Sequence, residues 1–425
     1  MSQQPVSRSS LSGRSSRRQP TLQSRLVSVL VSVLVVAASA AGVVALTGGG
    51  SATSRTPDDG GIGASQSSAT AQSENHDRTR NLQFGLSYGD TLTWMTDAQL
   101  NKAMQDAKEL GVHWLRVDLS WRNIQPDSPT QYLWERFDRV VAAARAQHLE
   151  ILATLSYTPR WAGDPSCARS QTCPPANNAR FAEFARHAAE RYASQGVHTW
   201  EIWNEPNIQK FWLTGPSTER YTALLTATSK AIRSVDPDAY LLLGGLAAVD
   251  TIPSKQYVSH KTFLAGLARE GALKQVDAIS YHPYTYPLLP STETATGTRF
   301  QDIDRTPDSL VSTLKRYGEP DMPVWLTETG APTWSGGRAA DSTDAQGTSH
   351  VTPRLQAEIA TDTVPAAAAK PSVGAVFWFG YRDGSAEGAS TRKSQFYGLT
   401  YYDGTRKPAF EAFRKAISAY KASGK

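Results

Sequence analysis

Two glutamates in the stretch TWEIWNEPN, residues 199–207, are the first side chains that could do chemistry. Glu201 and Glu205 lie four residues apart, among aromatic and amide side chains that suit the binding of a sugar. Four residues of a β-strand cover about 13 Å, so the two carboxylates cannot both touch one bond. Glu205 therefore needs a partner elsewhere in the chain. Glu201 is predicted to be a structural carboxylate, satisfied by side chains below the site.

Glu328, in the stretch LTETG, is the partner that the spacing favours. It follows Glu205 by 123 residues, which is three strand–helix units if each unit takes about 40 residues. Glycoside hydrolysis needs one carboxyl group to protonate the leaving oxygen and a second one to attack the sugar or to activate water. This pair of glutamates is therefore a candidate for that chemistry.

The elements that must position these glutamates follow from the hydrophobic pattern after residue 81, where apolar runs alternate with stretches of helical period. Strands are predicted at 83–87, 113–118, 150–155, 199–203, 239–243, 278–281, 324–327 and 375–379. Helices are predicted at 97–110, 133–147, 178–194, 217–235, 261–270, 306–317, 353–369 and 408–420.

This alternation predicts an α/β fold, a single (β/α)8 TIM barrel over residues 81–425. A doubly wound open sheet is the alternative, but it normally has a glycine-rich phosphate loop after its first strand, where this chain has Tyr88-Gly89-Asp90. In a barrel, active groups lie at the carboxyl ends of the strands. The residues predicted at those ends are Arg116, Asp118, Trp121, Tyr157, Trp161, Asn204, Glu205, Tyr281, His282, Pro283, Tyr284, Glu328, Trp378, Tyr381 and Arg382.

The same residues carry a resemblance to a known group of enzymes. WNEPN at 203–207 resembles the strand-four acid/base motif of clan GH-A of the glycoside hydrolases, and LTETG at 326–330 resembles the strand-seven nucleophile motif of that clan. HPY at 282–284, Arg116 on strand two and Trp378 on strand eight also match. The chain is most similar in these features to families 39 and 5, which include exopolysaccharide hydrolases.

The resemblance implies a retaining mechanism, with Glu205 as the general acid/base and Glu328 as the nucleophile. Asn204 would then bond the 2-hydroxyl of the sugar, and Tyr284 and Arg116 would keep Glu328 ionised. His282 is interpreted as an orienting residue instead of a metal ligand. Trp378 is expected under the sugar ring, with Trp121 and Trp161 as further aromatic surfaces. No cofactor and no metal are predicted.

The predicted substrate is an extracellular or cell-wall polysaccharide or an oligosaccharide, although neither the sugar nor its linkage can be read from these residues. A transglycosylase would use the same groups, with a sugar in place of water. A carbohydrate-binding protein without activity is the alternative of a different class. Retention of both glutamates with Asn204, Tyr284 and Arg116 speaks against that alternative.

The first 80 residues have a different composition. Residues 1–25 form a basic tail, and 26–47 are an uncharged run that is long enough to span a membrane at about 1.5 Å per residue. Cleavage of this run as a signal peptide near Ala40 is the competing interpretation, and a buried core helix is a third. Residues 48–80 predict a flexible linker rich in Gly, Ser and Thr. Both the membrane anchor and the signal peptide predict that the barrel lies outside the cytoplasm.

Charge and cysteine content agree with that compartment. The first 80 residues hold eight arginines against four acidic residues, which leaves +1 of the total charge of +5 for the remainder. No nucleic-acid partner is therefore predicted. Cys167 and Cys173, six residues apart, favour a disulfide over two free thiols, because disulfides persist in oxidising compartments. A zinc site would need two further ligands that the neighbourhood lacks.

Overall fold

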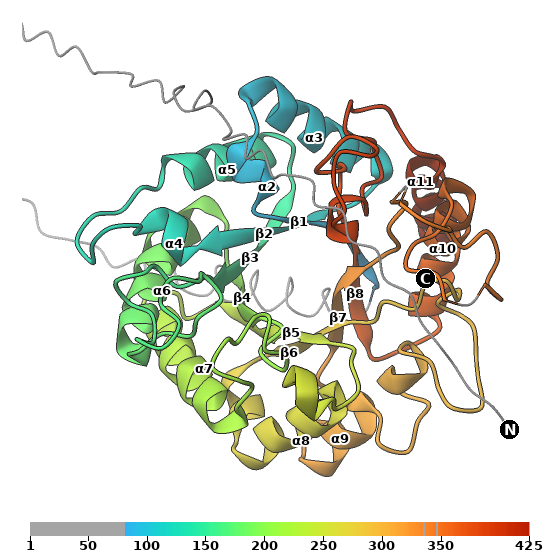
Figure 1. The fold of residues 1–425 in the computed structure, drawn as a ribbon. Coiled ribbons are helices and arrows are strands. Elements are labelled where there is room, and N and C mark those ends of the chain that lie inside the picture. Colours follow the sequence, from blue (N-terminus) through green and yellow to red (C-terminus); the bar gives the residue numbers. More distant parts are fainter. Residues whose placement is uncertain (1–80, 335, 346, 425) are drawn as a thin grey trace, which may run out of the picture. The chain divides into compact units, whose positions relative to one another are not determined.

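The computed structural model describes residues 81–334, 336–345 and 347–424. Eight parallel strands form a closed barrel in the order β1 to β8, each strand paired with its neighbours in sequence and β8 paired with β1. Figure 1 shows the strands as an inner ring with the longer helices around it. The predicted (β/α)8 barrel is thus confirmed.

The strands reproduce the predicted runs to within a few residues. They are β1 (Gln83–Gly89), β2 (Trp114–Ser120), β3 (Glu150–Ser156), β4 (Thr199–Asn204), β5 (Tyr240–Ala247), β6 (Ala278–His282), β7 (Val324–Thr329) and β8 (Val373–Phe379). The longer helices are α3 (Asp97–Leu110), α5 (Glu135–Ala146), α6 (Asn178–Tyr192), α7 (Thr218–Arg233), α8 (His260–Arg269), α10 (Pro353–Ala368) and α11 (Pro408–Ala422). Short helices α2 (Thr91–Trp94), α4 (Trp121–Ile124) and α9 (Leu310–Arg316) complete the α-helices of the described residues.

One predicted helix is much shorter than expected. A helix is predicted at 306–317, but α9 begins only at Leu310. The side chain of Ser309 accepts a hydrogen bond from the backbone N–H of Ser312 and so caps the helix. Thr306 instead begins a turn that is closed by a hydrogen bond from the backbone N–H of Ser309 to the carbonyl of Thr306.

The interior of the barrel is filled, with an aromatic floor below a charged layer. The floor is a separate buried cluster of Trp114, Leu152, Tyr240, Leu242, Ala278, Trp325, Ala375 and Phe377. One step further along the strands, Arg116, Thr154, Glu201 and Thr327 point into the same interior. Charged groups at this depth have no access to water, so they must satisfy one another.

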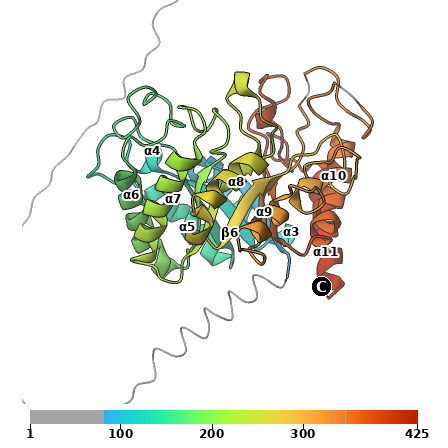
Figure 2. The same cartoon turned by 90° about the horizontal axis from the view of Figure 1, so that it is seen from below.

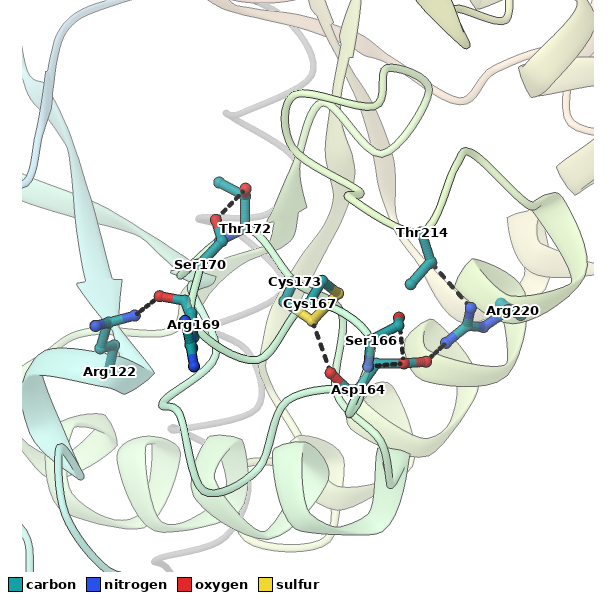
Figure 3. The surroundings of a disulfide bond; sticks show 10 residues. All are labelled: Arg122, Asp164, Ser166, Cys167, Arg169, Ser170, Thr172, Cys173, Thr214 and Arg220. Carbon is teal, nitrogen blue, oxygen red and sulfur yellow. Dashed lines mark hydrogen bonds and ion pairs between the residues drawn. A yellow bond between two sulfur atoms is a disulfide. The ribbon is translucent and has the colours of Figure 1, made fainter.

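The longest connections follow β3, β6, β7 and β8, at the carboxyl ends of the strands. Figure 2 shows these loops gathered at one end of the barrel. In the loop after β3, a disulfide joins Cys167 and Cys173, whose Cα atoms are 5.5 Å apart, which confirms the predicted pairing. Figure 3 shows this loop tied to α7 by the ion pair between Asp164 and Arg220, 3.2 Å apart.

The predicted membrane or signal segment 26–47, like the tail 1–25 and the linker 48–80, lies outside the described residues and stays a prediction. Within the part of the chain that the structure describes, none of the helices has both the length and the apolar character required to cross a membrane.

The disulfide generates a test of stability. Replacing Cys167 and Cys173 by alanine frees a short loop in the unfolded chain, so the free energy of unfolding should fall by about 2 kcal/mol. Alanine suits the site because Cys173 is fully buried. Urea unfolding measures the change, and a reducing agent should destabilise the original protein but not the variant. Equal stability of both proteins would show that the loop is held by its other contacts alone.

Candidate active site

Arg116 connects the residues at the centre of the candidate site. Its side chain is 1% exposed, and its guanidinium donates to Glu201 Oε2 (2.6 Å), Glu328 Oε1 (2.7 Å) and Asn204 Oδ1 (2.8 Å). A further bond of 3.1 Å reaches Ser87 Oγ. Burial opposes the charge of Arg116, but the carboxylates of Glu201 and Glu328 outweigh it, and the pKa is raised. The side chain is therefore a permanent cation that fixes groups from β1, β2, β4 and β7.

Glu201 is the structural carboxylate that its position predicts. It is fully buried and accepts hydrogen bonds from Arg116, from Thr154 Oγ1 (2.9 Å) and from Thr327 Oγ1 (2.9 Å). Every neighbour donates, so Glu201 acts only as an acceptor. It therefore serves to neutralise Arg116 and to orient two hydroxyl groups beneath the mouth of the barrel.

The carboxyl end of β4 is bent so that two consecutive side chains face the mouth. Trp203 has φ of 73° and Glu205 has φ of 44°, both in the left-handed region that costs a non-glycine residue about 1–2 kcal/mol. The Trp203 ring packs outward against Phe181 and Trp212, with its Nε1 donating to the carbonyl of Phe211 at 2.8 Å. These contacts interrupt the alternation of side chains along the strand after Glu201, and they stabilise the strained left-handed backbone. Asn204 and Glu205 consequently both line the site.

His282, at the end of β6, lies between the two candidate carboxylates. Its Nδ1 is 3.0 Å from Glu205 Oε1 and 3.7 Å from Glu328 Oε2. The ring rests directly on Gly245 of β5, where an added Cβ would come within 2.0 Å of Nε2. Glycine is required at this position because the imidazole occupies the space of a side chain. His282 is thus in direct contact with Glu205, and its interpretation as an orienting residue stays a prediction.

The hydrogen-bond network determines where His282 carries its hydrogen. Thr327 Oγ1 gives its only hydrogen to Glu201, so toward His282 Nε2, at 3.0 Å, it can only accept. Nε2 must therefore carry a hydrogen. The contact between Nδ1 and Glu205 then needs one further proton, which sits either on Glu205 or on the ring. Glu205 and His282 share a proton at the mouth of the barrel.

In contrast to the pair of Glu205 and His282, Glu328 is held in its ionised form by its contacts. Burial raises the pKa of this carboxyl, but the charges of His282 and Arg116 and the hydrogen bonds from Tyr284 and Arg116 outweigh burial, and the pKa is lowered. Tyr284 donates to Glu328 Oε2 at 2.7 Å. The pKa of His282 moves the other way: burial lowers it, but Glu328 and Glu205 outweigh burial and raise it. The site thus holds one ionised carboxylate beside a carboxyl–imidazole pair that retains a proton.

A cavity of about 390 Å³ opens above these groups. The lining from β2 to β4 and their following loops is mainly polar but includes Phe211. The lining from β6, β8 and the chain beyond it is mainly aromatic but includes Lys393, Ser394 and Gln395. The polar side includes Arg116, Asp118, Tyr157, Asn204 and Glu205, and the aromatic side includes Tyr284, Phe379 and Tyr397. Gln171, from the loop stapled by the disulfide, also lines this space. The cavity has the size and mixed lining of a site for a small polar ring.

The three tryptophans predicted as sugar surfaces do not line this cavity. Trp378 lies between the inward-facing Phe377 and Phe379, so strand alternation turns it outward, where it is fully buried against Phe413 of α11. Trp121 is fully buried and packs on Trp161, with their ring centroids 5.4 Å apart. Trp161 donates from Nε1 to the carbonyl of Gln125. Trp378 and Trp121 therefore act in packing, which corrects the sequence-based prediction. Trp161 is half-buried outside this cavity, and its role as an aromatic surface stays a prediction.

Sequence reasoning missed Phe379 and Tyr397, and it placed Asp118 and Tyr157 at strand ends without giving either one a role. Phe379 ends the predicted eighth strand, so strict alternation from Phe377 would have found it. Asp118 lies two residues after Arg116 on the same face of β2, which the same alternation indicates. Tyr397 comes from the long connection after β8, and no pattern in that segment signals its return to the mouth.

Glu205, His282 and Glu328 could also hold a metal ion, because one ligand atom of each lies within 4.8 Å of the others. Such an ion would compete with the shared proton, since Nδ1 of His282 and the oxygen of Glu205 would both become ligands. A second cavity of about 570 Å³ lies between the loops after β7 and β8, and its described lining includes none of these three residues.

Comparison with known proteins identifies the family of the chain. Residues 73–369 match the sequence model of the family described as cellulase (glycosyl hydrolase family 5). A β-xylosidase from Geobacillus stearothermophilus is 28% identical over 177 residues, which cover 39% of this chain and 33% of that protein. A β-xylosidase from Caldicellulosiruptor saccharolyticus is 34% identical over 152 residues, or 34% of this chain and 28% of that protein. The chain therefore spans about a third of the length of these curated relatives.

Solved structures share the fold at low sequence identity. GH5_18 from Streptomyces cattleya, determined in complex with GlcNAc, has a TM-score of 0.61 and 20% identity, with 81% of each chain covered. A family 39 glycoside hydrolase from Bacteroides cellulosilyticus has a TM-score of 0.59 and 20% identity, covering 80% of this chain and 64% of that one. These likenesses extend over the barrel.

The shared proton can be tested through Thr327. Thr327→Val removes the acceptor for the Nε2 hydrogen of His282, so the neutral ring should shift its hydrogen to Nδ1 and donate to Glu205. The pair should then lose its shared proton at a lower pH than in the original protein. Thr327→Ser keeps the hydroxyl and should titrate like the original. Nitrogen NMR shifts of His282 report both the tautomer and the titration, and an unchanged valine variant would refute the relay through Thr327.

Proposed function

Because the chain belongs to the cellulase family, glycosyl hydrolase family 5, we propose that it is a retaining glycoside hydrolase. Glu328 is the nucleophile, and Glu205 is the general acid and base. The substrate is an extracellular or cell-wall polysaccharide, or an oligosaccharide derived from it. The proposal rests on residues of the site and not on the barrel alone, which hosts many activities.

One distance carries the proposal. An oxygen of Glu205 and an oxygen of Glu328 lie within 4.8 Å of each other and of a ring nitrogen of His282. Retaining enzymes have their carboxyl groups about 5–5.5 Å apart, whereas inverting enzymes need about 6.5–9.5 Å to leave room for a water molecule. The short separation supports direct attack by a carboxylate on the sugar.

In the first step, an oxygen of Glu328 attacks the anomeric carbon while the bond to the leaving oxygen breaks. Glu205 passes its proton to that oxygen, so the leaving group departs as an alcohol. The two glutamates are suited to these opposite tasks. Arg116 and Tyr284 stabilise the ionised form of Glu328, and His282 provides the proton that Glu205 must hold.

In the second step, Glu205 takes a proton from a water molecule as that water attacks the anomeric carbon. The bond to Glu328 breaks, and the sugar leaves with its original anomeric configuration. His282 remains beside Glu205 and can share the returning proton. Each glutamate ends the cycle in the state in which it began.

Asn204 and the aromatic side of the cavity bind and orient the sugar. The Oδ1 of Asn204 accepts from Arg116, which leaves its NH2 group to face the cavity and donate to a hydroxyl such as that on C2. The rings of Phe379 and Tyr397, with centroids 5.4 Å apart, offer an apolar surface for the C–H face of a sugar. Phe379 takes the place that was predicted for Trp378.

The matched relatives direct the search for a substrate. Both curated relatives are described as β-xylosidases, which supports a β-linked substrate and makes xylan and xylo-oligosaccharides the first to test.

We also propose that the barrel works outside the cytoplasm, either anchored to the membrane or secreted. The apolar run at 26–47 and the disulfide between Cys167 and Cys173 support this location.

Glu328→Gln tests the nucleophile. The amide cannot attack, so turnover of xylo-oligosaccharides or of another accepted glycan should fall by at least about 10⁴-fold. Sugar binding, measured by calorimetry, should be retained. For the original protein, NMR of the first product should show the anomer of the substrate. Inversion would contradict the mechanism. If the original protein hydrolysed no glycan and the variant bound sugar equally well, the result would favour a carbohydrate-binding protein without activity.

Glu205→Ala tests the acid/base. Loss of protonation should slow the cleavage of poor leaving groups by about 10²–10⁴-fold. A 2,4-dinitrophenyl glycoside needs little protonation, so its first step should stay fast. Azide should then restore turnover by giving a glycosyl azide of retained configuration. Thr154→Ser, which keeps the hydroxyl that contacts Glu201, is a control that should need no azide. A variant that azide does not rescue would exclude Glu205 from this role.

A further inference from the structure

Asp118 is a buried acid in the cavity that the proposed mechanism does not use. It lies two residues beyond Arg116 on the inward face of β2, in register with Thr154 of β3. At about 3.3 Å per residue, it stands one layer nearer the mouth than Arg116. The residue is only 6% exposed, yet it lines the same cavity as Glu205 and Glu328.

Among the described residues, Asp118 differs from the other buried acids in having no partner. Glu201 and Glu328 pair with Arg116, and the remaining four also pair with cationic or imidazole side chains. These four are Asp106 with Lys102 and Arg406, Asp236 with His198, Asp302 with Lys261, and Asp383 with Lys407. No hydrogen bond or ion pair from a described residue reaches the carboxylate of Asp118. Such a group is costly to bury unless a ligand satisfies it.

Electrostatics do not supply the missing partner. Burial raises the pKa of Asp118 to about 7, and although Arg116 opposes this, the charges of Asp90, Glu328 and Glu201 add to it. The guanidinium of Arg116 is directed to Glu201, Glu328, Asn204 and Ser87. The carboxyl group is therefore poised either to accept or to donate a hydrogen bond. It remains available to a molecule that enters the cavity.

A second polar group beside Asp118 is also available. Tyr157, at the end of β3, has φ of 65° and lines the cavity, and its hydroxyl has no hydrogen bond to any other described residue. The charge of Asp118 contributes to the raised pKa of Tyr157, after burial. With the NH2 group of Asn204, these two side chains form a polar wall opposite the rings of Phe379 and Tyr397. A pyranose has a matching shape, with hydroxyl groups at its edge and C–H groups on its faces.

We propose that Asp118 binds a ring hydroxyl of the sugar that is cleaved, and that it makes this cavity specific for neutral sugars over uronic acids. The proposal rests on the proposed function, because it places the sugar in the cavity of Glu205 and Glu328. A hydroxyl satisfies the buried carboxyl group as either donor or acceptor. A uronate would add another negative charge beside Asp118, Asp90 and Glu328. Two lysines, Lys210 and Lys393, also line the cavity, but neither forms an ion pair with Asp118.

The test compares the original protein with Asp118→Ala on 4-nitrophenyl β-xyloside, β-glucoside and β-glucuronide. The original should cleave at least one neutral glycoside and leave the glucuronide intact. The alanine variant should lose about 10- to 150-fold in kcat/KM on the neutral substrate, as expected for a lost hydrogen bond to a charged group. Asp321→Asn, which removes an exposed acid at the other end of the barrel, should leave this value unchanged.

Deoxy substrates identify the contact. With aryl glycosides that lack single hydroxyl groups, one deoxy position should reduce kcat/KM for the original protein but not reduce it further for Asp118→Ala. Equal penalties in both proteins at every position would overturn the proposal, as would an alanine variant as active as the original. Thermal unfolding checks the fold, and removal of an unpartnered buried acid should not lower the melting temperature. If the original protein cleaves no glycan at all, the result contradicts the proposed function itself and not only the role of Asp118.

Discussion

The buried positive charge of Arg116 is the constraint on which the rest of the site depends. A guanidinium at the centre of a barrel must be neutralised and fully hydrogen-bonded, and it is satisfied here by Glu201, Glu328, Asn204 and Ser87. Removing one partner of such a buried pair typically costs about 3–5 kcal/mol, so the groups hold one another in place. The hydrogen bonds that satisfy Arg116 therefore also set the positions of the candidate nucleophile, Glu328, and of the Asn204 amide that we propose to bind the sugar.

The charge of Arg116 also determines the direction of the hydrogen bonds between Glu201, Thr327 and His282. Because Glu201 acts only as an acceptor, it takes the hydrogen of Thr327, and Thr327 can then only accept from His282. That direction places a hydrogen on Nε2 and leaves Nδ1 to share a proton with Glu205. A structural carboxylate deep in the barrel thus orients the proton that the chemistry needs at the mouth, four residues further along β4.

The strain at the end of β4 and the polar wall of the cavity belong to the same arrangement. The left-handed backbone at Trp203 and Glu205 turns Asn204 and Glu205 to the mouth together, while the Trp203 ring stays packed outside the barrel. Asp118 and Tyr157 extend this polar side on β2 and at the end of β3, and Phe379 and Tyr397 face them. One wall can bind hydroxyl groups and the other a C–H face, so the proposed substrate selection and catalysis would use the two sides of one space.

The sequence by itself determined the eight strand–helix units, the strand ends that carry Glu205 and Glu328, and the structural part of Glu201, because hydrophobic period and spacing are local properties of the chain. It also indicated the disulfide, since the two cysteines are close in sequence. Tertiary structure alone decided which aromatic rings meet the cavity: Trp378 turned outward, and Tyr397 arrived from a distant connection. It likewise decided that Asp118 has no partner and that Thr327 directs the hydrogen of His282. Contacts between strands that lie far apart in the chain leave no local pattern in the sequence. They form only when the barrel closes, so they are visible only in the tertiary structure.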